Sequence, residues 1–359
     1  MENEERKDLK QPSLAVSIII VLFLAACFLI QLVTVGEPDV HMTLVFAAVV
    51  AIILLLIFNK TPFALIEEGI IHGCKIATIS MMILMFIGVM IPAWIAAGTI
   101  PTLIYYGLQI ISPSIFLLTA SVVCALATLC TGTSWGSAAT FGVALMGIGG
   151  GLGVPDAMTA AAVVCGSIFG DKLSPISDTV NLSSGTCEVN IFDHIKSVAT
   201  ATLPAYIIAL VVFTVLGFRF AGGNADSAAV NEVMKVLSEN FKLDPGHALI
   251  SLVPMVLVLV MALRKMNALA TIVASAMSAM IIAIIFQGYS IVDMMSYMNY
   301  GYVIETGNFD VDKLMNRGGL QSMMWTVSIG YLGLSYGGIL EKTGVLNTLL
   351  FSAQAITKN

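Results

Sequence analysis

Long runs of apolar residues are the feature that most constrains what this chain can fold into. A transmembrane helix needs about 20 predominantly apolar residues. Only 11% of the 359 residues are charged, against roughly 25% in an average soluble domain. The sequence therefore predicts an all-α, polytopic helical membrane protein. Its spans are expected at 14–35, 41–58, 74–97, 115–131, 197–218, 248–263, 267–287 and 318–340.

The distribution of Lys and Arg predicts which side of the membrane each loop faces, because cytoplasmic loops carry more of them. The N-terminal tail carries basic residues, whereas segments 36–41 and 98–114 carry none. Lys60 and Arg264 fall in loops that alternate with those segments. The N-terminus, the 59–73 loop and the 264–266 turn are therefore expected on the cytoplasmic side.

The two longest polar segments, 222–247 and 288–317, are then expected outside the cell. Both are rich in Asp, Asn, Lys and Gly, which is typical of solvated loops. The first of them has the pattern of a short amphipathic helix near 228–242.

Two apolar segments, 137–150 and 157–170, are each only 14 residues long. At 1.5 Å per residue each would reach about 21 Å, short of a hydrocarbon core of roughly 30 Å. Glycine-rich or polar stretches bound both of them. Two short crossings and one re-entrant hairpin both fit this pattern, and either one implies broken helices at membrane depth.

The stretch at 170–181, GDKLSPISDTVN, concentrates polar chemistry in this apolar chain. Pro175 lacks a backbone donor and disfavours helix at Ser174. Asp171 and Asp178 add carboxylates. Carboxylates, hydroxyls and freed carbonyls are the oxygen ligands that a hard cation needs. A solvated loop is the other interpretation, but the neighbouring short helices and the break at 132–136 favour a discontinuous helix in a transporter.

At these residues the chain resembles the NhaC family of Na+/H+ antiporters. The resemblance is carried by TGTSWG at 131–136, by GDKLSPISDT at 170–179 with Asn181-Leu182 after it, and by PTLIYYGL at 101–108. It extends over essentially the whole chain. Val180 departs from the family pattern, which more often has Thr there.

The resemblance implies a secondary active transporter in the plasma membrane that exchanges Na+ for H+ and needs no cofactor. A related alternative is exchange of malate for lactate, coupled to Na+ and protons. The expected ion-binding residues are Asp171, Ser174, Ser177, Asp178, Thr179 and Asn181, with Asp178 and Asp171 as the Na+ ligands. The expected helix breaks and substrate pathway comprise Thr133, Ser134, Trp135, Lys172 and Pro175.

The chain, 1–359, is expected to be one transmembrane domain built from an inverted repeat. Pairing 73–104 with 319–350 at a constant offset of 246 (319 − 73) aligns Gly73 with Gly319 and Gly98 with Gly344. The first repeat would occupy about 74–200 and the second would start near 319 and be cut short at 359. On this interpretation the chain ends inside its second repeat, and an alternative to an active transporter is a truncated form, inactive without a missing C-terminal part.

Other functions lack support in the sequence. No phosphate loop, nucleophile elbow or HExxH pattern suggests an enzyme. No basic run suggests a nucleic-acid partner, and the six cysteines lack zinc-ligand spacing. The expected partners are Na+, H+, small organic acids and the lipid bilayer, and assembly as a homodimer is left open.

Overall fold

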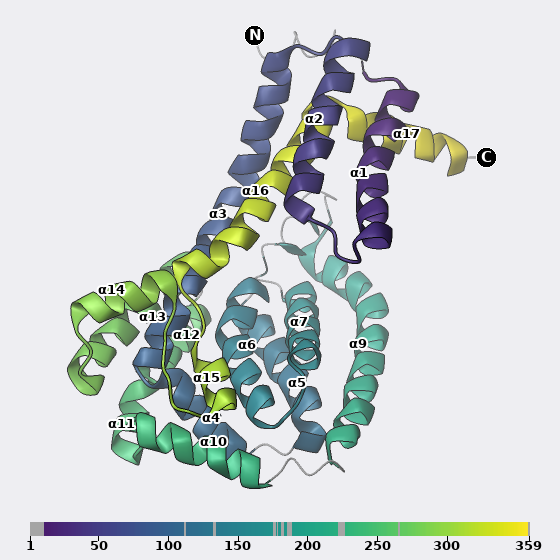
Figure 1. Cartoon of the computed structure of the whole chain (residues 1–359). Helices are drawn as coiled ribbons and strands as arrows, with labels where there is room; N and C mark the ends of the chain where they lie inside the picture. Colours follow the sequence, from purple (N-terminus) through teal and green to yellow (C-terminus); the bar gives the residue numbers. More distant parts are fainter. Residues whose placement is uncertain are drawn as a thin grey trace. The chain divides into compact units, whose positions relative to one another are not determined.

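The structure is a computed structural model. It describes residues 11–110, 113–131, 134–174, 177, 179–180, 183–184, 189–221, 227–264 and 266–357. The described part of the chain is helical and contains no strand, as the sequence predicts. It divides into two compact units, Met1–Leu84 with Met324–Asn359, and Met85–Met323. Figure 1 labels the helices.

The first unit contains α1 and α2, the first part of α3, the second part of α16, and α17. These helices span Leu14–Thr34, Val40–Phe58, Phe63–Ala96, Leu320–Lys342 and Val345–Thr357. Capping side chains fix the starts of α1 and α2. The Ser13 side chain accepts a hydrogen bond from the backbone N–H of Val16, and the Asp39 side chain accepts one from the backbone N–H of Met42.

The core of the first unit lies where α2, α3 and α16 meet. Ala51, Leu55, Ile66 and Ile339 are fully or almost fully buried there. Glycines let α3 and α16 pack closely. A Cβ at Gly69 would lie 2.8 Å from the carbonyl oxygen of Gly338. Small residues at helix contacts are how membrane helices gain close packing.

The second unit contains the end of α3, the first residues of α16 and the other helices that the structure describes. They are α4 (Thr99–Ile110), α5 (Pro113–Thr131), α6 (Ser134–Gly151), α7 (Asp156–Leu173), α9 (Ile191–Ala221), α10 (Ser227–Asn240), α11 (Pro245–Ser251), α12 (Val253–Leu263), α13 (Ala268–Ile282), η2 (Ala283–Gln287), α14 (Ile291–Tyr300) and α15 (Phe309–Met315).

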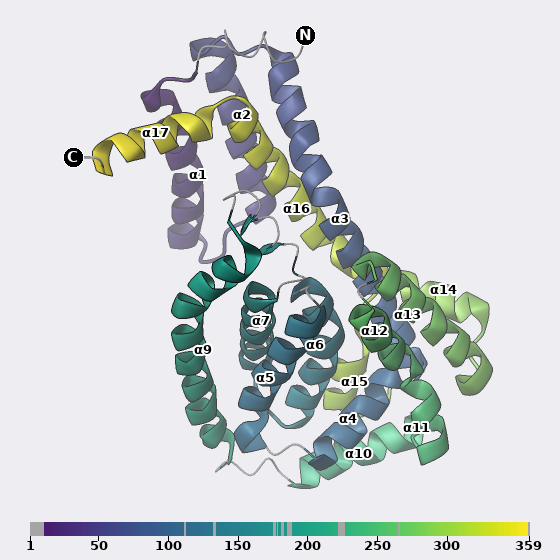
Figure 2. The ribbon, with the colours of Figure 1, turned by 180° about the vertical axis from the view of Figure 1, so that it is seen from behind.

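Helices α5, α6, α7 and α9 pack together in this unit (Figures 1 and 2). Tyr206 of α9 shares a hydrogen bond with Ser121 of α5 at 3.1 Å and stacks on Phe169 of α7 with ring centroids 3.8 Å apart. The opposite face of α9 exposes Ile208 and Val215. Such apolar exposure is expected of a helix whose outer face meets lipid.

Five described helices are long and apolar enough to cross a membrane, or up to six if the bent pair Asn231–Asn240 and Pro245–Val258 counts as one span. The five are Leu14–Thr34, Val40–Phe58, Phe63–Ala96, Ile191–Arg219 and Leu269–Gln287. The amphipathic helix expected near 228–242 is confirmed as α10.

Several sequence-based boundaries are wrong. Segment 63–73 belongs to α3 rather than to a loop, 98–114 contains α4, and 288–317 contains α14 and α15. Segments 137–150 and 157–170 extend to the 18-residue helices α6 and α7. Their reach is then about 27 Å at 1.5 Å per residue. The sequence underestimated them because Ser, Gly and charged residues at their ends are helical.

Two helix–glycine–helix junctions share local geometry at the offset of 246. Helix α3 ends at Ala96 and α4 begins at Thr99, while α16 ends at Lys342 and α17 begins at Val345. The glycines between them, Gly98 and Gly344, have left-handed φ values of 81° and 83°, a conformation that favours glycine. The inverted repeat itself stays a prediction.

Candidate functional site

The carboxylate of Asp171 is the centre of a buried polar cluster at the end of α7. Its side chain is 5% exposed. Ser177 Oγ donates to Asp171 Oδ1 at 3.0 Å, and Thr179 Oγ1 donates to Asp171 Oδ2 at 2.8 Å. The two hydroxyl oxygens lie 3.0 Å apart. Each carboxylate oxygen therefore has its own hydroxyl, one from the buried Ser177 and one from Thr179, which is exposed.

The cluster exists because the α7 helix stops just after Asp171. Helix α7 ends at Leu173, and Ser174 has extended backbone angles of −83° and 121°. This confirms the helix end that Pro175 predicts at Ser174. The chain can then turn back, so that Ser177 and Thr179 reach the carboxylate.

Helices α5 and α7 run parallel, with their backbones in contact along a line that we call the α5–α7 seam. A Cβ on Gly166 would overlap the carbonyl oxygen of Ser121, and one on Gly170 would overlap that of Ala125. Both pairs are 45 residues apart (166 − 121 and 170 − 125). A constant difference means that the helices point the same way, and the Gly-x-x-x-Gly spacing explains their close approach.

Because the helices are parallel, their C-terminal ends lie together beside Asp171. Ser174 Oγ donates to the carbonyl oxygen of Leu129 at 2.9 Å, again with a difference of 45 (174 − 129). The last four carbonyls of a helix lack intrahelical donors and carry partial negative charge. Two such ends and a carboxylate create an environment that favours a cation.

The structure brings together four of the predicted site residues, Asp171, Ser174, Ser177 and Thr179. Asp178, Asn181, Thr133 and Pro175 lie outside the described residues. Lys172 is in the last turn of α7 and is partly buried.

Ser134 and Trp135 are the first two residues of α6. Trp135 is 55% exposed, so its ring is not part of the buried cluster.

Two hydroxyls on the α5–α7 seam were missed by the sequence analysis. Thr128 and Ser167 are both buried, on α5 and α7 respectively. Ser167 lies one helical turn before Asp171, and helical residues four apart share a face. Small residues recur every four positions in both α5 and α7, and this spacing was the sequence signal that could have predicted the close contact of the two helices.

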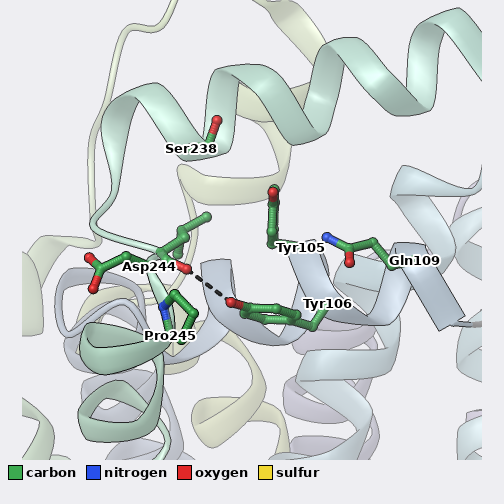
Figure 3. Close-up of a pocket in the computed structure, with 7 residues that line it drawn as sticks. Tyr105, Tyr106, Gln109, Ser238, Asp244 and Pro245 are labelled. Atoms are coloured by element: carbon green, nitrogen blue, oxygen red, sulfur yellow. Dashed lines mark hydrogen bonds between the residues drawn. The ribbon is translucent and has the colours of Figure 1, made fainter.

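A separate open pocket of about 310 Å³ lies between α4 and the α10–α11 connection (Figure 3). Its lining includes Tyr105, Tyr106 and Asp244. Tyr106 Oη donates to the carbonyl oxygen of Leu243 at 3.1 Å, and Asp244 Oδ1 is 2.6 Å from His247 Nδ1. Among the described residues, no Lys or Arg lines this pocket, and no member of the Asp171 cluster belongs to it.

The chain matches the sequence model of the Na+/H+ antiporter family over residues 10–180 and 166–358. It is 38% identical over 285 residues to the malate-2H+/Na+-lactate antiporter of Bacillus subtilis, covering 79% of this chain and 60% of that protein. It is 36% identical over 288 residues to the Na+/H+ antiporter NhaC of Alkalihalophilus pseudofirmus, covering 80% and 61%. It is 33% identical over 284 residues to the arginine/ornithine antiporter ArcD of Halobacterium salinarum, covering 79% and 58%.

The matched part of the chain spans about three fifths of the length of these relatives. No solved structure matches the chain. The family match covers nearly every residue from 10 to 358, and it agrees with the motifs at 131–136 and 170–179. The chain belongs to the Na+/H+ antiporter family.

Proposed function

We propose that this protein is a secondary active transporter that exchanges Na+ for H+ at Asp171. The observation that carries the proposal is the buried Asp171 carboxylate, which is held by two hydroxyls where two parallel helices end. The names of two of the three relatives above include both Na+ and H+.

The site has the chemistry for both ions. A carboxylate binds either a proton or a metal cation, and metal binding requires the deprotonated form. The Ser177 and Thr179 hydroxyls each offer lone pairs in addition to the hydrogen that they donate. Na+ would take Asp171, Ser177 and Thr179 as oxygen ligands, and a proton would take Asp171 alone. Competition between the two ions makes loading with one release the other.

Asp178 and Asn181 remain predicted ligands of the same site. Asp178→Asn, compared with Asp171→Asn, would separate the carboxylate that titrates from one that only adds negative charge. Lys172, next to Asp171, is positioned to balance the charge of the site or to meet an anion.

We place the protein in the plasma membrane with its N-terminus in the cytoplasm. The basic residues Arg6, Lys7 and Lys10 before the first span support this orientation. The apolar, exposed surfaces of the long helices support contact with lipid.

A second candidate is the exchange of organic acids coupled to Na+ and protons. The 38% identity to a malate-2H+/Na+-lactate antiporter favours it. The pocket near Tyr106 does not, because a dicarboxylate would meet Asp244 there and no Lys or Arg among the described residues.

Transport in proteoliposomes distinguishes the two candidates. Adding Na+ to proteoliposomes that contain this chain and hold a pH gradient should collapse the gradient, whereas K+ at the same ionic strength should not. Addition of malate or lactate should have no further effect. The opposite result is a gradient that resists Na+ alone and collapses only when Na+ and malate are both present. That result would contradict Na+/H+ exchange and support organic-acid exchange.

A further inference from the structure

Two buried hydroxyls on the α5–α7 seam lack an ordinary hydrogen-bond partner. Thr128 is 0% exposed and Ser167 is 1% exposed. Neither Thr128 Oγ1 nor Ser167 Oγ bonds to a nitrogen or oxygen atom in the part of the chain that the structure describes. Ser167 lies beside the thiol of Cys124, and a thiol is a weak hydrogen-bonding group.

Several other hydroxyls in the long helices behave differently, although Ser17 on α1 and Thr102 on α4 are also buried without a partner among the described residues. Thr119, Thr202 and Thr214 each donate to the carbonyl oxygen four residues earlier, at 2.9, 2.9 and 2.7 Å. This is the usual way for Ser and Thr to satisfy their hydroxyl within a helix. A buried hydroxyl that is left unbonded costs stability, so its presence calls for an explanation such as a ligand.

The position of the two hydroxyls points to the ligand. Ser167 precedes Asp171 by one helical turn on the buried face of α7. Across the seam, a Cβ on Gly170 would lie 2.9 Å from the Cβ of Thr128, and Gly170 is the residue before Asp171. Thr128 is also next to Leu129, whose carbonyl binds Ser174. Both residues therefore lie on the seam close to the helix position of Asp171, Ser167 one turn before it and Thr128 across from the residue that precedes it.

We propose that Thr128 Oγ1 and Ser167 Oγ are further ligands for the cation that binds at Asp171, and this inference rests on the proposed function. Hard cations prefer several oxygen ligands. The Ser177 and Thr179 hydroxyls already donate to Asp171. The Thr128 and Ser167 oxygens can accept a cation without breaking a hydrogen bond to a nitrogen or oxygen atom of the described residues. They favour Na+ over H+, because a proton needs only the carboxylate.

The purified chain in detergent, probed with ²²Na+, tests this. Thr128→Val removes the hydroxyl and keeps the shape of the side chain, and Ser167→Ala removes the other hydroxyl. Each should weaken Na+ binding about tenfold, whereas Thr128→Ser should bind nearly as well as the wild type. Without Na+, the Thr128→Val protein should melt at the same or a higher temperature, because an unbonded buried hydroxyl has been removed. A purely structural Thr128 would instead give a lower melting temperature.

Thr119→Val on the same helix is the matched control, because its hydroxyl bonds to Ile115 and it is not part of the cluster. It should bind Na+ like the wild type. Wild-type affinity in both Thr128→Val and Ser167→Ala, with binding lost in Asp171→Asn, would overturn this inference and leave the proposed function intact. So would weaker binding accompanied by a lower melting temperature in both variants. Na+ binding that survives in Asp171→Asn would contradict the proposed function, and the inference would fall with it.

Discussion

Gly170 illustrates how a single residue can hold the proposed ion site in place. It faces the backbone of α5 at Ala125, directly before Asp171 in the sequence. The backbone of α7 contacts the backbone of α5 here. Neither helix backbone can therefore move away from an added atom as a flexible side chain could. The parallel ends of α5 and α7 depend on this contact, and with them the position of the Asp171 carboxylate.

Gly170→Ala should destabilise the protein by about 1–3 kcal/mol, the usual cost of overpacking. The added Cβ would overlap the Ala125 carbonyl oxygen. A thermal melt of the protein in detergent measures the effect. Gly337→Ala is the control, because nothing lies within 4 Å of a Cβ at that helical glycine. It should be neutral or stabilising by up to about 1 kcal/mol. Equal melting temperatures for both variants would contradict the close packing of α5 and α7.

At the residue scale, the sequence predicted what lies within one short stretch. Asp171, Ser177 and Thr179 are at most eight positions apart (179 − 171), and the helix end at Pro175 made their meeting foreseeable. The sequence could not single out Thr128 and Ser167. A hydroxyl in an apolar run is compatible with any helix, since it normally bonds to its own backbone, and only the packing of α5 on α7 makes these two unusual.

Among the elements, the α7 helix end at Ser174 matters most for the proposed mechanism. Ser174 is fully buried although its backbone is not helical. Non-helical backbone is tolerated in a membrane only where protein buries it or where it lines a watery cavity. An ion site meets that condition, whereas a solvated loop would leave Ser174 exposed.

Cysteine labelling tests this element. In a variant whose native cysteines are replaced, Ser174→Cys should react slowly with impermeant thiol reagents and more slowly still with Na+ present. Ser183→Cys is the matched control, because Ser183 is exposed and lies only nine positions later (183 − 174). It should react fast, with no effect of Na+. Fast reaction at both positions would identify the stretch as a solvated loop.

The helices that the sequence missed share one property. Helices α4, α14 and α15 and the first turns of α3 contain polar residues or are too short to span. Charge counting and apolar run length therefore assigned these segments to loops. A capping motif explains why one of them, α14, is helical. Ser290 and Asp293 form a reciprocal capping box at the start of α14.

For the whole molecule, the membrane class and most spans were predictable because a bilayer demands long apolar helices. The arrangement of those helices was not, since it depends on contacts between residues far apart in the sequence, such as Ser121 with Tyr206. The shared geometry at Gly98 and Gly344 keeps the inverted repeat as a prediction, now with a local structural feature to compare.

The central claim is that one buried carboxylate exchanges Na+ for H+. Its most direct test is proton release on addition of Na+ to the purified chain in weakly buffered detergent, recorded with a pH indicator over a range of pH. The wild type should release up to about one proton per bound Na+, and Asp171→Asn should release none. Asp156→Asn, which changes a partly exposed carboxylate at the start of the same helix, should release protons like the wild type. Undiminished release from Asp171→Asn would contradict the claim.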